Sequence, residues 1–180
     1  MYGMIHKAAR EFTIQQHGED RWRAILSRTD LSDEHFISGQ HYSDDATLSL
    51  IGAIAEDLQI DAGDVLRAFG QYWIRYTATT DYAAALQMCG DDLVTFLHNL
   101  DDLHRGIKTT MPEAQLPSFS VLQADDRRIE LLYQSERQGL ASFVSGLLTG
   151  LMDKFSETGA ISWREDGEDL IFTIARGQPA

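Results

Sequence analysis

The sequence predicts an α+β fold: a mainly helical N-terminal part packed on a small antiparallel sheet with a C-terminal helix. Apolar residues recur at steps of three and four through most of the first 110 residues, which is typical of amphipathic helices. After Pro112 and Pro117, short segments suited to strands follow. A chain of 180 residues, 43% hydrophobic and without an internal repeat, fits one domain spanning residues 1–180.

Five helices are expected before residue 90. The best-marked start is Ser43 with Asp44 and Asp45, because serine is a favoured N-cap and acidic side chains suit the first turn. The expected helices cover residues 4–15, 22–26, 43–58, 61–76 and 81–88.

A sixth helix is expected to begin at Asp91 and to present His104 to the interior. Its apolar stripe is formed by Leu93, Phe96, Leu97, Leu100, Leu103 and Ile107. His104 lies on the same face, because the stripe repeats at helical spacing. A histidine there can be a hydrogen-bonded core residue or a metal ligand, and neutral imidazole is a common ligand to haem iron.

The last third of the sequence reads as two hairpins separated by a helix. Strands are expected at residues 118–123 and 128–133, joined through turn-forming acidic residues at 125 and 126. An apolar helix follows over residues 139–155. Strands at 161–164 and 170–175 flank a turn at 165–167.

Composition excludes several classes of protein. The formal net charge of -13 opposes binding to a nucleic-acid backbone or an anionic membrane. Cys89 is the only cysteine, so it forms no internal disulfide or cysteine-rich metal site, and we expect it to be a small buried residue. The most apolar run, residues 140–152, is too short to cross a bilayer, and no signal peptide is evident, so we expect a cytoplasmic protein.

Tyr133, Ser135 and Arg137 stand at every second position, so they share one face if the chain is extended there. Two hydroxyl groups and a planar guanidinium on one face form a clamp for carboxylates. Such a clamp together with one axial histidine meets the needs of a haem, through its propionates and its iron. A structural interpretation stays open, in which Ser135 caps a following helix and Arg137 extends into water.

The Tyr-x-Ser-x-Arg spacing, together with His104 and Pro117, resembles the haem nitric oxide/oxygen-binding (H-NOX) family, which includes the haem domain of soluble guanylate cyclase. The resemblance extends over nearly the whole chain, including the segment A-F-G-Q-Y-W at 68–73. It implies a haem b buried between two lobes. It also implies that His104 binds the iron, that Tyr133, Ser135 and Arg137 bind the propionates, and that Pro117 presses against the porphyrin.

The resemblance also implies that Ile5, Trp73 and Phe143 line the distal pocket. Aligning the chain at residues 145–148 places Phe143 where oxygen-binding members carry a tyrosine. Phenylalanine has no hydrogen-bond donor. The missing hydrogen bond weakens the binding of dioxygen more than the binding of nitric oxide or carbon monoxide. The indole of Trp73 can supply a donor or simply form an apolar wall. We therefore expect a sensor of nitric oxide, also binding carbon monoxide, that excludes dioxygen.

We expect no catalytic activity, and a histidine kinase or a diguanylate cyclase as the signalling partner, as for bacterial members that stand alone. Three alternatives remain open: a dioxygen sensor, a cofactor-free protein-interaction module and a peroxidase-type haem enzyme. A peroxidase needs a polar acid–base group on the distal side, where the sequence places Phe143. An enzyme without haem lacks support, because no nucleophile motif or phosphate-binding loop is present in the sequence.

Overall fold

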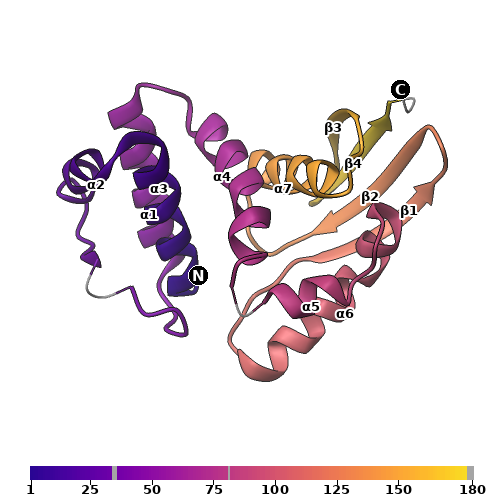
Figure 1. Ribbon diagram of the computed structural model, residues 1–180, viewed down its shortest axis with the longest axis horizontal. Coiled ribbons are helices and arrows are strands. Elements are labelled where there is room, and N and C mark those ends of the chain that lie inside the picture. The colour runs from indigo at the N-terminus through magenta and orange to yellow at the C-terminus, as the bar shows by residue number, and fades with distance from the viewer. Residues whose placement is uncertain (34–35, 81, 178–180) are drawn as a thin grey trace. The chain divides into compact units, whose positions relative to one another are not determined.

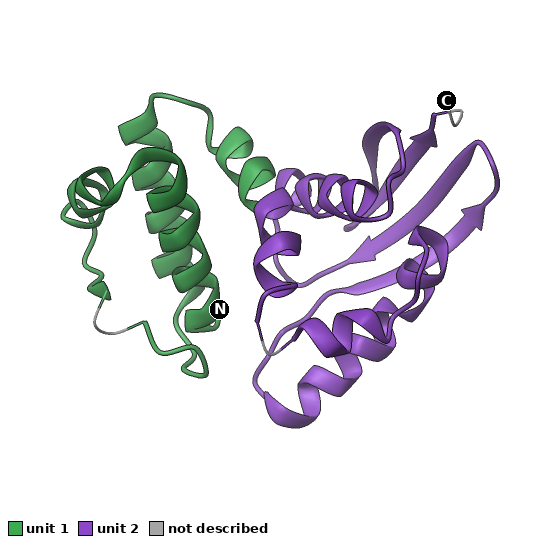
Figure 2. Ribbon diagram, viewed as in Figure 1, with its two compact units in different colours: residues 1–69 green, residues 70–180 purple. Residues whose placement is uncertain are grey.

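The computed structural model describes residues 1–33, 36–80 and 82–177 of the protein (Figure 1). The chain forms two compact units, Met1–Phe69 and Gly70–Ala180 (Figure 2). The α+β prediction is confirmed, with helices first and one antiparallel sheet later in the chain. None of the helices in the described ranges is both long enough and apolar enough to cross a membrane.

In the described part of the first unit, helices are the main elements, together with an isolated β-bridge between Tyr2 and His41. Its helices are α1 (Gly3–His17), α2 (Glu19–Leu26), α3 (Asp44–Leu58) and the beginning of α4 (Ala62–Thr77). The expected cap of α3 is confirmed, because the Ser43 hydroxyl accepts a hydrogen bond from the Ala46 N–H at 3.2 Å. Phe12, Trp22, Ile25 and Leu50 form the centre of this unit's core.

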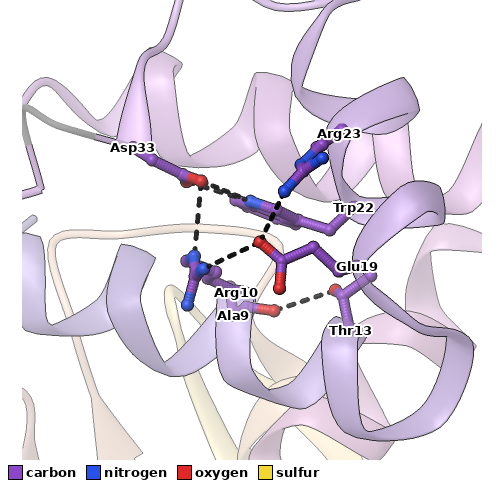
Figure 3. A network of polar contacts seen from close by, with 7 residues as sticks. All are labelled: Ala9, Arg10, Thr13, Glu19, Trp22, Arg23 and Asp33. Carbon is purple, nitrogen blue, oxygen red and sulfur yellow. Dashed lines mark hydrogen bonds and ion pairs between the residues drawn. The ribbon is translucent and has the colours of Figure 1, made fainter.

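A polar network joins α1, α2 and the segment after α2 in the first unit (Figure 3). The buried Trp22 indole donates to both carboxylate oxygens of Asp33 at 2.9 Å. Arg10 on α1 pairs with Asp33 and with Glu19, at 3.3 Å and 3.5 Å. These contacts tie α1, the start of α2 and the segment after α2 together, so Asp33 satisfies the one polar atom of a fully buried indole.

His6 on α1 is fully buried, and it lies one residue after Ile5. Its Nε2 is 2.9 Å from the Thr47 hydroxyl, while its Nδ1 has no hydrogen-bond partner in the described ranges. Burial, and then the positive N-terminus, lower the pKa of His6 to about 4. His6 is therefore neutral at pH 7 and is part of the core, where its ring is tilted by 32° to that of Phe36 and lies edge-on to that of Tyr42.

The second unit contains a four-stranded antiparallel sheet in the order β1-β2-β4-β3. The strands are β1 (Ser118–Ala124), β2 (Arg128–Gln134), β3 (Gly159–Asp166) and β4 (Asp169–Arg176). The helices are the end of α4, α5 (Ala83–Gln87), α6 (Leu93–Thr110) and α7 (Ala141–Lys154). Register places Phe119 opposite Tyr133, and Tyr133 opposite Leu170.

One face of the sheet forms the core of the second unit with α6 and α7. Phe119, Leu131, Tyr133 and Phe172 belong to the same buried cluster as residues of α6 and α7. The helical members include Leu93, Phe96 and Leu97 on α6 and Val144, Leu148, Leu151 and Met152 on α7. The predicted apolar stripe of α6 therefore faces the sheet that carries Tyr133.

Several predicted boundaries differ from the structure. The sixth helix begins at Leu93, because the Asp92 carboxylate accepts from the Thr95 N–H at 2.9 Å and Asp92, not Asp91, is the cap. β3 begins at Gly159, two residues before the expected start. The prediction missed this start because the side chains of β3 are mostly exposed and show no alternation of burial. The expected helix 81–88 is α5, and position 81 lies outside the described residues.

Two glycines allow α4 and α7 to pack with their backbones close together. A Cβ at Gly70 would lie 2.2 Å from the Phe143 carbonyl oxygen. A Cβ at Gly150 would lie 2.9 Å from the Gln71 carbonyl oxygen. Neither backbone oxygen can move without moving its helix, so this contact fixes how α4 presents Trp73 and how α7 presents Phe143.

We predict that Gly70→Ala lowers the stability of the protein by about 1–3 kcal/mol, because the added methyl group overlaps backbone. Gly106→Ala on α6 is the matched control, since a Cβ there meets nothing within 4 Å. Alanine at an exposed helical position should instead stabilise by up to about 1 kcal/mol. Thermal unfolding followed by circular dichroism measures both variants; equal midpoints for the two would contradict the close packing of α4 and α7.

Candidate functional site

His104 lies half-buried on α6, and its orientation is fixed by the chain that enters β1. Its Nδ1 is 2.8 Å from the Pro117 carbonyl oxygen. A carbonyl oxygen only accepts hydrogen bonds, so Nδ1 must carry the proton and donate. In the neutral ring the lone pair is then on Nε2, which leaves that atom able to bind a metal ion.

The surroundings of His104 favour the neutral ring. Burial is the main cause that lowers its pKa below the ordinary value, and Lys108 adds to this effect. The bond to Pro117 and the charge of Asp101 act in the opposite direction but do not outweigh burial. His104 is therefore a neutral imidazole at pH 7, with a defined tautomer and a lone pair available on Nε2.

Asp101, one turn before His104 on α6, ties this helix to the beginning of β1. Its carboxylate accepts from the Ser118 hydroxyl and from the Phe119 N–H, each at 2.7 Å. These bonds hold the residues that directly follow Pro117, so they also hold the carbonyl that orients His104. Asp101 was not among the residues predicted from the sequence, where its spacing of three residues from His104 was the only available signal.

Tyr133, near the end of β2, is only 4% exposed. Its ring lies 5.3 Å from that of Phe119 and 6.1 Å, edge-on, from that of Phe172. Burial raises the pKa of the Tyr133 phenol, and a hydrogen bond with Ser135 opposes this shift. Phe119 also lies 5.9 Å from the His104 ring, so one aromatic residue links His104 to the start of the clamp motif.

Ser135 and Arg137 follow the end of β2 and continue its alternation. Positions 133, 135 and 137 are buried or half-buried, whereas 134, 136 and 138 are exposed, as the shared-face prediction requires. The Ser135 hydroxyl accepts from the Arg137 N–H at 3.0 Å. The interpretation in which Ser135 caps the next helix is wrong, because α7 begins after Leu140.

The Arg137 guanidinium is bound to Gln115, in the segment between α6 and β1. Its two terminal nitrogens donate to the Gln115 carbonyl oxygen and to the Gln115 side-chain oxygen, the latter at 3.1 Å. The interpretation in which Arg137 extends into water is therefore wrong as well. No local pattern in the sequence points to Gln115, because its partner lies 22 positions away.

Ser135, Arg137 and Gln115 line an open hollow of about 720 Å³ in the second unit. Lys108 and the acidic side chains of Glu113, Glu136, Glu168 and Asp169 are also part of its wall. Carboxylates outnumber cations there, so a bound carboxylate must be held by directed hydrogen bonds rather than by the overall charge of the hollow. His104 and Tyr133 do not line it.

The three distal-pocket candidates lie on three helices. Trp73 is half-buried on α4 and stacks on Tyr76 with ring centroids 5.8 Å apart. Phe143 is half-buried on α7, where the α4 backbone approaches closely at Gly70. Ile5 is half-buried on α1 of the first unit.

These residues fit a haem better than a metal ion held by protein alone. Within the described ranges, no group of three or more His, Cys, Asp or Glu side chains can hold a metal ion. A haem iron brings its porphyrin nitrogens with it, so it needs only one axial side chain from the protein, such as Nε2 of His104. The phenol, hydroxyl and guanidinium of the 133–137 motif are suitable hydrogen-bond partners for the propionate carboxylates of a haem.

Comparison with solved structures identifies the fold as that of H-NOX domains. The Fe(II)NO form of an H-NOX protein from S. oneidensis superposes with a TM-score of 0.87 at 22% identity, covering 99% of this chain and all of that one. The oxygen complex of an H-NOX domain related to soluble guanylate cyclases gives a TM-score of 0.82 at 20% identity, covering 99% and 96%. At these identities the likeness shows a shared fold.

The chain belongs to the Haem-NO-binding family, whose model matches residues 2–162. Soluble guanylate cyclase gcy-35 of Caenorhabditis elegans is 30% identical over 165 residues, which is 89% of this chain and 24% of that protein. The chain thus spans about a quarter of the length of the curated relatives that it matches. The matched region covers most of both units and includes all eight candidate site residues.

We predict that Asp101→Asn destabilises the protein by about 1–3 kcal/mol, because the amide cannot accept both bonds as the carboxylate does. Asp102→Asn is the control, since that side chain is exposed and pairs with the exposed Arg105 on the same helix. Loss of this exposed ion pair should lower the free energy of unfolding by at most about 1 kcal/mol. Urea unfolding measures both, and a smaller loss for Asp101→Asn than for Asp102→Asn would refute the anchoring role.

Proposed function

We propose that this chain is a haem-based gas sensor that binds nitric oxide and carbon monoxide at ferrous haem b and excludes dioxygen. One observation carries the proposal: His104 donates from Nδ1 to the Pro117 carbonyl oxygen, which leaves the lone pair on Nε2 for iron. Membership of the Haem-NO-binding family supports it. Residues 1–180 would act as one sensor domain that includes both units.

In this proposal His104 is the iron ligand, and Tyr133, Ser135 and Arg137 receive the propionates. Pro117 would have two roles, its carbonyl orienting His104 and its ring pressing against the porphyrin. When bound, the haem supplies a ferrous iron that takes up diatomic gases. The chain's residues orient that group, exclude water and link its neighbourhood to the rest of the fold.

The link to the fold follows from the contacts of α6. His104 and Asp101 lie one turn apart on this helix, and both bind the chain at the start of β1. A displacement of α6 at His104 would therefore pull on Pro117, Ser118 and Phe119 together. If gas binding displaced α6 in this way, a partner that binds the displaced and the original arrangement with different affinity would sense the gas, as coupling between two states requires.

Gas selectivity in this proposal depends on Phe143 and Trp73. The fold itself does not decide it, since the similar structures include an Fe(II)NO form and an oxygen complex. Phe143 has no hydrogen-bond donor, and a missing hydrogen bond weakens the binding of dioxygen more than that of nitric oxide. The Trp73 indole is stacked on Tyr76, which favours its role as a wall.

The proposed output is regulation of a separate signalling enzyme, either a histidine kinase or a diguanylate cyclase. The curated relatives are guanylate cyclases, and this chain spans only about a quarter of their length. We propose that residues 1–180 sense the gas rather than catalyse a reaction, as membership of the Haem-NO-binding family supports. The acidic surface, with a net charge of -13, suits docking on a basic protein surface better than binding to nucleic acid.

We predict that His104→Gly loses haem during purification or retains it only with added imidazole, because the glycine leaves space for a free ligand. His98→Gly is the matched control, as His98 is exposed on the same helix and the helix-propensity cost is equal. Absorbance in the Soret region per protein measures haem content. Equal haem content in the two variants would remove His104 from its proposed role.

We predict that the reduced protein changes its absorption spectrum with nitric oxide and with carbon monoxide but gives no reversible oxygen spectrum in air. Phe143→Tyr supplies a hydroxyl donor and should produce an oxygen-dependent, reversible change. Phe143→Leu, which adds no donor, should behave as the wild type does. A stable oxygen spectrum of the wild-type protein would contradict the proposed selectivity, and colourless protein would favour a cofactor-free interaction module.

A further inference from the structure

The segment at residues 115–117 contacts two parts of the candidate site that are far apart in the sequence. Gln115 accepts hydrogen bonds from the two terminal nitrogens of Arg137. Two positions later, the Pro117 carbonyl accepts from His104. The proposed propionate clamp and the proposed iron ligand are thus attached to the same short piece of chain.

We propose that Gln115 is a positioning residue that orients Arg137 for a haem propionate and couples this clamp to His104. The proposal rests on the haem-sensor function proposed above and names a residue of that site beyond the ligand and the clamp. Gln115 itself would not contact the iron. It would act through the guanidinium at one end of the segment and through the Pro117 carbonyl at the other.

The orienting effect follows from the shape of the guanidinium. The group is planar and its N–H donors form a rigid fork, so two bonds from its terminal nitrogens fix the plane of the whole group. Gln115 supplies both acceptors, one from its backbone and one from its side chain. A carboxylate that meets Arg137 then meets a fork that is already oriented, which lowers the entropic cost of binding.

The coupling follows from the shortness and stiffness of the segment. Consecutive Cα atoms are about 3.8 Å apart, so Gln115 and Pro117 remain within about 7 Å of each other. Proline fixes its own φ and restricts Leu116 to extended conformations. Beyond Pro117, Asp101 holds Ser118 and Phe119. A shift of Gln115 therefore reaches the carbonyl that sets the basicity of His104.

Gln115→Ala tests the proposal by two measurements on the haem-loaded protein. Haem dissociation, followed by transfer to excess apomyoglobin, should be about 2–10-fold faster than in the wild type, the effect of one lost hydrogen bond. The iron–histidine stretching band of the reduced protein should move to lower frequency in the resonance Raman spectrum, because a looser Pro117 carbonyl makes the imidazole a weaker ligand. Gln115 is exposed, so the variant should fold normally.

The matched control is Gln123→Ala. Gln123 is also an exposed glutamine whose side-chain oxygen accepts from an arginine, with 2.9 Å between Gln123 and Arg128. It lies near the opposite end of β1 from Pro117, so both the dissociation rate and the stretching band should match the wild type. The double variant Gln115→Ala/Arg137→Ala should lose haem no faster than Arg137→Ala alone, because the two residues act as one unit.

The outcomes separate this inference from the proposed function. If the wild type binds haem and Arg137→Ala releases it faster, while Gln115→Ala matches Gln123→Ala in both measurements, the positioning role is overturned and the sensor function stands. If the wild type takes up no haem, both are overturned. A faster loss with an unmoved stretching band overturns the coupling to His104.

Discussion

The hydrogen bond from His104 Nδ1 to the Pro117 carbonyl is the interaction on which the candidate site depends. It fixes the tautomer of the ring, since only Nδ1 can then carry the proton, and it leaves the Nε2 lone pair in a defined direction. It also attaches α6 to the chain that enters β1. Asp101 repeats this attachment one turn away, so the ring and the strand are held as one piece.

The candidate iron ligand His104 is connected to the clamp motif at 133–137 by two further sets of contacts in the second unit. Phe119 lies beside both His104 and Tyr133, and Tyr133 begins the motif that ends at Arg137. Gln115 accepts hydrogen bonds from Arg137 and lies in the same short segment as Pro117. The candidate ligand and the candidate clamp are therefore joined both through an aromatic contact and through hydrogen bonds.

The parts that could be predicted from the sequence are those governed by local periodicity. The inward turn of His104 and the alternation from 133 to 138 depend on helical and extended geometry alone, and both are present. Asp101 and Gln115 were missed because their partners lie 17 to 22 positions away and only folding brings them together. The start of β3 was missed for a different reason, because an exposed edge strand carries no burial pattern. The roles of the eight candidate residues toward haem stay predictions.

The most direct test is a resonance Raman spectrum of the reduced wild-type protein, recorded with iron isotopes and with nitrogen-labelled histidine. We expect one low-frequency band that shifts on both substitutions, which identifies a bond between iron and a histidine nitrogen. A haem-containing protein whose spectrum has no band sensitive to both labels would contradict the assignment of His104 as the iron ligand.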